Sequence, residues 1–150
     1  MGLDMYLEAV QYVSDFTEGG KPLIESIKNN SVNGLEDFHP THITYELAYW
    51  RKANAIHGWF IKNVLSEKTG YDPVFVSLKK LEDLKEVCEK VLHDMDLAPE
   101  LLPVTKGFFF GEYEYNEYYT FYVTKTLTAL NKILSNPNAR KWWITYRASW

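Results

Sequence analysis

The sequence has few of the residues that order a chain without a large hydrophobic core. It has a single cysteine, Cys88, in 150 residues, which excludes an internal disulfide framework and a cysteine-rich zinc site. Eight glycines and six prolines, with no dominant low-complexity tract, exclude a collagen-like or disordered chain. A chain of this length with 46% hydrophobic residues can bury roughly 70% of its unfolded surface. We therefore expect one domain over residues 1–150.

Long apolar runs and an excess of basic charge are also missing. No apolar run approaches the ~18 residues of a transmembrane helix. The first residues lack the basic region of a signal peptide and include Asp4. Sixteen basic and 20 acidic residues give a net charge of −4, which argues against non-specific nucleic-acid binding. We expect a cytoplasmic protein, with neither a membrane nor non-specific nucleic acid as a partner.

Aromatic residues, in contrast, are abundant. The chain has 11 Tyr, eight Phe and five Trp. Many of these rings would stay exposed in a domain of this size, and exposed apolar patches are commonly covered by a partner. A homo-oligomer is therefore one expectation.

Alternating apolar residues predict three strands, at residues 5–13, 42–50 and 142–150. The most polar stretch, at about residues 19–42, lies between the first two strands. It contains turn signals, among them Asn33 followed by Gly, and a short helix after Pro22. We interpret this stretch as an excursion from the core rather than a domain.

Helical spacing of apolar residues follows in three segments, at about residues 51–66, 78–95 and 115–134. Ser77 is the expected N-cap of the second segment, and Gly70 lies just past the end of the first. Because strands at both ends of the chain need partners, the simplest arrangement pairs the first strand with the last. The predicted fold class is α+β: a small, mainly antiparallel sheet with about three helices on one face.

The densest cluster of polar side chains lies at the predicted start of the central helix. There Trp50, Asn54 and His57 fall at i, i+4 and i+7, nearly on one helix face. Arg51 and Lys52, with the free N–H groups of a first helical turn, would form an anion site beside the indole. The alternative is that Trp50 belongs to the core, Asn54 bonds at the helix start, and the two cations are solvated.

Two further stretches could line the same site. Nine aromatic residues lie between positions 108 and 122. They either fill the core, with three phenylalanines between glycines as a buried strand or tight loop, or form a cleft wall for a planar ligand. Phe109, Tyr115 and Tyr119 are the candidates for such a wall. Arg147 and Trp150 either close its rim or belong to a docked final strand.

Other chemistries have little support in the sequence. Asp37, His39 and His42 match no zinc spacing, so no metal site is expected. Cys88 falls in a helical apolar stripe, and no phosphate-binding glycine loop or nucleophile-elbow motif occurs. We predict no cofactor and no catalytic residue. A small hydrolase with His57 as general base is kept as an alternative.

Four parts of the chain carry a resemblance: Met1–Leu7, Tyr49–Phe60, Leu102–Gly111 and Ala148–Trp150. With their MGLDMYL, YWRKANAIHGWF, GFFFG and ASW sequences, they resemble a family of small proteins encoded by tailed bacteriophages and prophages. That family has no assigned reaction, so no residue role is transferred from it. The resemblance implies expression from a small accessory gene in the cytoplasm of an infected bacterium. Small phage proteins of this kind often counter host defence, by binding a nucleotide second messenger or by blocking a host protein.

These observations lead to a hypothesis of a non-enzymatic phage protein that sequesters a small, phosphate-bearing, nucleotide-like ligand. Arg51 and Lys52 would hold the phosphate, and Asn54 and His57 the polar edge of the ring. The residues expected to stack on the ring or close the site are Trp50, Phe109, Tyr115, Tyr119, Arg147 and Trp150. The first alternative is a protein–protein inhibitor of a host factor, because Trp and Tyr are favoured interface anchors. The second is the hydrolase.

Overall fold

The computed structural model describes residues 2–32, 34–65 and 72–150. The strands in these ranges are β1 Asp4–Tyr12, β2 His42–Arg51, β3 Val74–Phe75 and β4 Trp143–Ser149. The α-helices are α1 Gly20–Asn29, α2 Asn54–Phe60, α3 Leu78–His93, α4 Ala98–Leu101 and α5 Glu117–Leu134. Shorter helical segments are the 3-10 turns η1 Leu35–Asp37, η3 Met95–Leu97 and η4 Ala139–Lys141 and the π-helical η2 Ile61–Leu65. The predicted turn at Asn33, the helix end at Ser66 and the stop at Gly70 lie outside the described residues.

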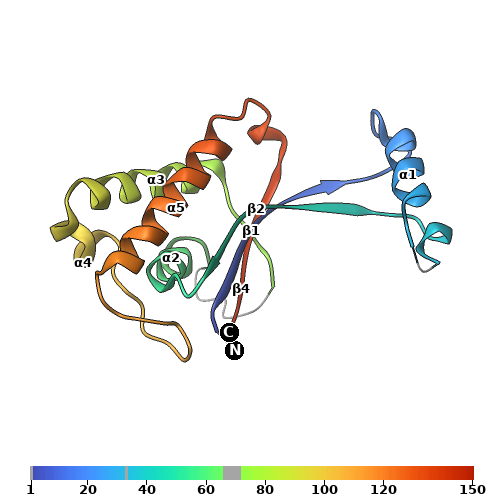
Figure 1. Ribbon diagram of the computed structural model, residues 1–150. Coiled ribbons are helices and arrows are strands. Elements are labelled where there is room, and N and C mark those ends of the chain that lie inside the picture. The colour runs from blue at the N-terminus through green and yellow to red at the C-terminus, as the bar shows by residue number, and fades with distance from the viewer. Residues whose placement is uncertain (1, 33, 66–71) are drawn as a thin grey trace.

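The described strands form one antiparallel sheet in the order β2-β1-β4-β3 (Figure 1). β1 pairs with β2 on one side and with β4 on the other, so the first and last strands of the chain are neighbours. This confirms the predicted α+β class and the predicted pairing of the terminal strands. The alternation pattern does not predict β3, because two residues are too few to show a period.

Helices α2, α3 and α5 cover one face of the sheet (Figure 1). Alternate side chains on the central strands point toward them and are buried, among them Met5 and Leu7 on β1 and Ile144 and Tyr146 on β4. α3 begins at the predicted cap, Ser77, whose hydroxyl accepts a hydrogen bond from a backbone N–H. None of the described helices has the length and apolar content needed to cross a bilayer. The other face of the sheet, which we call the open face, has no helix packed directly on it among the described elements.

The central helix begins later than the sequence predicts. Arg51 still belongs to β2, and Lys52 has a left-handed φ of 59°, so α2 starts only at Asn54. The chain stays extended through Arg51 instead of starting the helix, because pairing with β1 satisfies backbone hydrogen bonds next to the ladder. The Lys52 N–H donates to the Leu3 carbonyl oxygen at 2.7 Å. Trp50 is therefore a strand residue and does not share a helix face with Asn54.

Strands β1 and β2 continue past the body of the molecule as a two-stranded arm (Figure 1). β4 pairs with β1 only as far as Val10, which lies opposite Trp143, whereas the β1–β2 ladder runs on to Tyr12 and His42. Residues 13–32 and 34–41, with α1 and η1, form a head at the far end of this arm. The polar excursion expected from the sequence falls largely within this head.

The glycine-flanked Phe segment is a turn on the surface. Phe108 is 78% exposed and Phe109 44% exposed, whereas Phe110 is buried. Phe109 has a φ of 64° and Gly111 a φ of 94°, and left-handed residues interrupt the extended backbone of a strand. The interpretation of the three phenylalanines as core is therefore correct for Phe110 only.

Candidate functional site

A recess of about 200 Å³ opens at the start of α2, where the sequence places its candidate site. Its floor is the beginning of α2, one wall is the first turns of α5, and the other wall is part of the loop between α4 and α5. The polar and aromatic lining residues include Lys52, Asn54, Glu112, Glu114, Tyr118 and Tyr122.

Asn54 joins the floor of the recess to the loop. Its Nδ2 donates to the carbonyl oxygens of Phe110 at 3.2 Å and Glu112 at 2.7 Å. Its Oδ1 accepts a hydrogen bond from the Thr105 N–H at 3.0 Å. The residue is 4% exposed, so these bonds occupy both ends of a buried amide. Asn54 therefore shapes the recess, and its amide is not available to read the edge of a ligand.

Three tyrosines of α5 line the recess. Asn116 caps this helix, because its Oδ1 accepts hydrogen bonds from the N–H groups of Tyr118 at 3.0 Å and Tyr119 at 3.3 Å. Tyr119 is buried, its hydroxyl donates to the Leu102 carbonyl oxygen at 2.8 Å, and burial raises the pKa of that hydroxyl. Tyr118 is 64% exposed and Tyr122 is half-buried, so their rings are open to a ligand.

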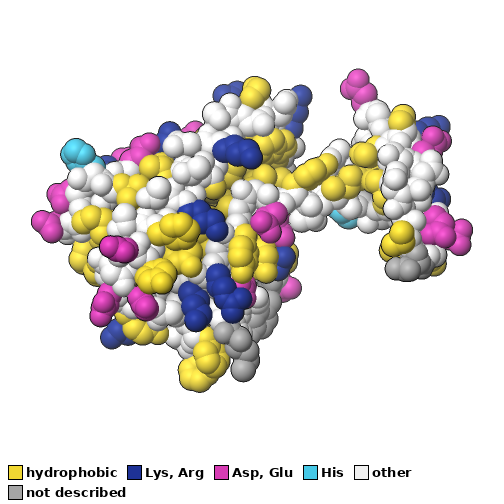
Figure 2. Space-filling view, viewed as in Figure 1, with side chains coloured by type: hydrophobic (Ala, Val, Ile, Leu, Met, Phe, Trp, Pro, Cys, Tyr) yellow, Lys and Arg dark blue, Asp and Glu magenta, His cyan; other side chains and the backbone are white. Residues whose placement is uncertain are grey.

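Two cationic side chains converge beside the recess. A Cβ placed on Gly2 would lie 3.2 Å from Cε of Lys52 and 3.5 Å from Nη2 of Arg51. Arg51 also lies 3.8 Å from the Asp4 carboxylate. Burial raises the pKa of Tyr122, and the charge of Arg51 opposes that rise. Figure 2 shows Lys and Arg side chains in the middle of the body, next to hydrophobic side chains.

Two carboxylates share the lining with these cations. Glu112 and Glu114 line the recess together with Lys52, and Oε2 of Glu112 accepts a hydrogen bond from Nδ2 of Asn116 at 2.7 Å. Both glutamates are exposed. The lining therefore combines carboxylates, which accept hydrogen bonds, with the cation of Lys52.

Trp50 and His57 lie in the core and do not line the recess. Trp50 is fully buried, and its Nε1 donates to Oγ1 of Thr126 at 2.9 Å. His57 is 1% exposed, and a hydrogen bond of 2.7 Å joins its Nδ1 and the Tyr146 hydroxyl. Burial lowers the pKa of His57 to about 4. Its Nε2 has no hydrogen-bond partner among the described residues, and its ring meets Trp150 edge-on at 5.5 Å between centroids.

The remaining predicted site residues are dispersed. Arg147 lies on the open face, where Nε and Nη2 each donate to the Glu8 carboxylate at 2.9 Å. Trp150 follows β4 at the end of the chain, and Phe109 lies on the surface turn. Tyr115 precedes α5, and its hydroxyl accepts a hydrogen bond from the backbone of the same loop. Of the ten predicted residues, the recess brings together Lys52, Asn54 and Tyr119, with Arg51 beside them.

The sequence prediction of the site omits Tyr118 and Tyr122, which line the recess. Tyr118 and Tyr122 are four residues apart at the start of a helix, which places them on one face and could have marked them as a pair. Nζ of Lys125 lies 5.7 Å from the centroid of the Tyr49 ring, a contact between α5 and β2 that only the folded chain reveals.

The described residues contain no group of three or more His, Cys, Asp or Glu side chains suited to a metal ion. Cys88 is buried, and burial raises the pKa of its thiol to about 12, which keeps it protonated. Comparisons with protein-family models, with curated proteins and with solved structures find no match to this chain. Its function is therefore inferred from the recess itself.

Proposed function

We propose that this chain is a non-enzymatic protein that binds a small nucleotide-like ligand in the recess at the start of α2. The ring of the ligand lies against Tyr118 and Tyr122, and its phosphate lies outside, on Lys52 and Arg51. The observation that carries this proposal is the convergence of the two cations beside a recess with a tyrosine wall. Aromatic rings and cations at one site suit a ligand with a planar ring and an anion.

The recess is large enough for one ring system of the ligand, its base. Its volume of about 200 Å³ is below the roughly 300–1,000 Å³ of pockets for drug-sized ligands. A base fits, whereas a sugar and phosphate extend over the rim toward Lys52. Stacking contributes about 1–3 kcal/mol per base, and a charged hydrogen bond roughly 1.5–3 kcal/mol. After the cost of association, these terms correspond to binding in the micromolar range.

The carboxylates favour particular bases. Glu112 and Glu114 can accept hydrogen bonds from an exocyclic amino group, such as N4 of cytosine or N6 of adenine. Uracil has no amino group. The proposed ligands therefore carry an amino-bearing base, and a uridine nucleotide is expected to bind most weakly.

Simple binding fits the geometry better than hydrolysis. His57, the general base of the hydrolase alternative, does not line the recess, and burial lowers its pKa to about 4. A general base must reach the proton that it removes. The resemblance to phage proteins supports a role in an infected bacterium, in which the bound nucleotide is a signal of host defence.

Calorimetric titration with AMP, CMP, GMP, UMP and their cyclic forms tests this proposal. We expect micromolar binding of an amino-bearing nucleotide, and at least about fivefold weaker binding by Tyr118→Ala because a stacking ring is lost. Lys52→Ala should weaken binding about tenfold or more through loss of a charged contact. The matched controls are Phe108→Ala and Lys132→Ala, both at exposed positions outside the recess lining. No heat with any nucleotide, or equal losses in the controls, would overturn the proposal.

Inhibition of a host protein is a second candidate, and one observation favours it. The head presents exposed apolar side chains, including Phe16 at 99% and Phe38 at 69% exposure, which are suited to a protein interface. A stoichiometric partner recovered from host lysate by a monomeric chain, without nucleotide binding, would favour this function over the first.

A further inference from the structure

The accessible surface area of this chain is larger than that of a compact monomer of the same mass. Its accessible surface is 9725 Å², whereas a compact monomer of 17.6 kDa has about 7,900 Å². The surplus is therefore about 1,800 Å² per chain. Two chains that covered this surplus would bury roughly twice that area, which lies within the range of about 2,000–5,000 Å² for obligate homodimers.

Much of this surplus belongs to the arm and head. The head has little core of its own: among its described residues, only Val13, Gly20 and Ile24 are buried. Its exposed apolar side chains are Phe16 at 99%, Val32 at 65%, Leu35 at 61% and Phe38 at 69% exposure. A small unit with so few buried residues is expected to need a covering surface.

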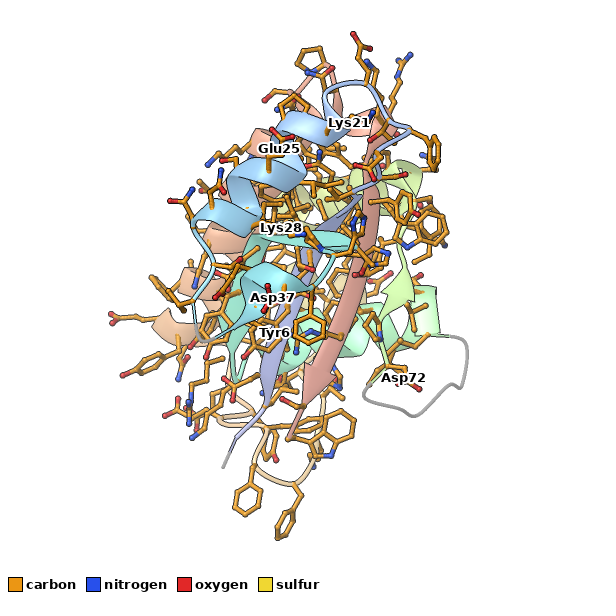
Figure 3. The ribbon with its side chains drawn as sticks, turned by 90° about the vertical axis from the view of Figure 1, so that its right-hand side faces the viewer. Tyr6, Lys21, Glu25, Lys28, Asp37 and Asp72 are labelled. Carbon is orange, nitrogen blue, oxygen red and sulfur yellow. The ribbon has the colours of Figure 1, made fainter. Side chains whose placement is uncertain are left out.

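The arm keeps the head away from its own body. The β1–β2 ladder is continuous to Tyr12 and His42, and the Val13 N–H then donates to the Thr41 carbonyl oxygen at 2.9 Å. Figure 1 shows the head separated from the sheet by the length of this ribbon. Figure 3 looks along the arm, with the head in front of the open face that carries Tyr6. The surface that covers the head must therefore come from another molecule.

A matching patch lies at the base of the arm, where β4 parts from β1. Trp143 is 58% exposed and Phe75 47% exposed, and their ring centroids are 4.6 Å apart. Arg140 and Lys141, both exposed, precede Trp143 in the chain. We call these four residues the root patch. It combines exposed aromatic rings with positive charge.

The head has the opposite charge. It contains two lysines and five acidic residues, which gives a net charge of −3. The five acidic residues are all exposed: Asp15, Glu18, Glu25, Glu36 and Asp37. Figure 3 labels Lys21, Glu25 and Lys28 on α1 and Asp37 on η1. An acidic, aromatic head complements a basic, aromatic root patch in both charge and apolar character.

We propose that two copies of this chain associate through their arms, with the head of each copy on the root patch of the other. The separation of head and root patch is the same in both copies, so antiparallel arms satisfy both contacts at once. Such a closed two-fold interface leaves no unpaired head. This dimer does not depend on nucleotide binding, since no residue of the head or root patch lines the recess.

Sedimentation equilibrium of the full chain over a range of concentrations tests the dimer. We expect twice the mass of 17.6 kDa for the natural chain and monomers for Phe16→Ser combined with Phe38→Ser. Both side chains are so exposed that the monomer fold does not need them, and circular dichroism verifies the fold. Phe121→Ser, at a 58% exposed position on α5, is the matched control and should remain dimeric. A natural chain that is monomeric at every concentration would overturn the proposal, whether or not it captures a host protein. Dissociation of the dimer by Phe121→Ser but not by the head variant would overturn it as well.

A charge exchange tests which surfaces meet. Lys141→Glu should raise the dissociation constant of the dimer about tenfold or more, because it places a carboxylate opposite the acidic head. Combining Lys141→Glu with Glu36→Lys and Asp37→Lys in one chain should restore part of the affinity. A dimer that is insensitive to all three substitutions would place its interface elsewhere and contradict the proposed contact.

Discussion

At the scale of single residues, His57 shows how a polar side chain becomes part of a core. Its ring lies between Phe110, at 5.1 Å between centroids, and Trp150, at 5.5 Å, and its Nδ1 is hydrogen-bonded to the Tyr146 hydroxyl. From the sequence alone, His57 is a candidate ligand-binding residue, because it is polar and only three positions after Asn54. It does not reveal the aromatic residues from distant segments that surround the ring. Because its side chain is buried, His57 is a core residue.

The lowered pKa of His57 predicts that stability depends on pH. The imidazole has a pKa of about 4 when folded and 6.5 when unfolded, so folding favours the neutral form. Its contribution is complete above pH 6.5. It falls as the pH drops from 6.5 to 4, because the unfolded chain then binds a proton that the folded chain does not. The expected loss is about 3 kcal/mol.

Urea unfolding at pH 7.5, 5.5 and 4.5 measures this dependence. The variant His57→Gln should show a shallower loss of unfolding free energy between pH 6.5 and 4 than the natural chain. His93→Gln, at an exposed position on α3, is the control and should retain the natural slope. Equal slopes for the natural chain and His57→Gln would show that this histidine is not the group responsible.

At the scale of elements, the regular strands and helices are the part that sequence periods predict well. α3 and α5 each repeat apolar residues over four or more turns, so the pattern is clear. The start of α2 is predicted too early because a strand and a helix meet there, and the ladder with β1 extends β2 to Arg51. Contacts between distant segments, such as the pairing of β3 with β4, leave no local period to detect.

Asn54 gives a test of how the elements around the recess are held together. Asn54→Ala removes three hydrogen bonds to the loop between α4 and α5, among them the bond to the carbonyl oxygen of the buried Phe110. We expect the unfolding free energy to fall by about 2–4 kcal/mol. Asn131→Ala, at an exposed position on α5, should change it by less than about 0.5 kcal/mol. Denaturant unfolding of both variants would decide; a small effect of Asn54→Ala would mean that the loop does not depend on this amide.

At the scale of the whole molecule, the shape follows from how far two strands extend. The sequence predicts that the stretch between the first two strands is polar and leaves the core. It does not predict how far from the body the head lies, because that distance depends on β1 and β2 pairing beyond the end of β4. The sequence does not predict the recess either, since its walls come from α2, α5 and the loop before α5. Only Lys52, Asn54 and Tyr119 of the predicted site line it.

We propose that a nucleotide-like ligand binds beside Lys52 and the tyrosines of α5. Heteronuclear NMR of the labelled chain, titrated with the nucleotide that binds best, tests its location most directly. We predict that amide signals of Lys52, Asn54, Tyr118 and Tyr122 shift progressively, while that of Ile24 in the head does not. Shifts confined to the head or the open face, or unchanged recess signals at saturating nucleotide, would contradict binding in the recess.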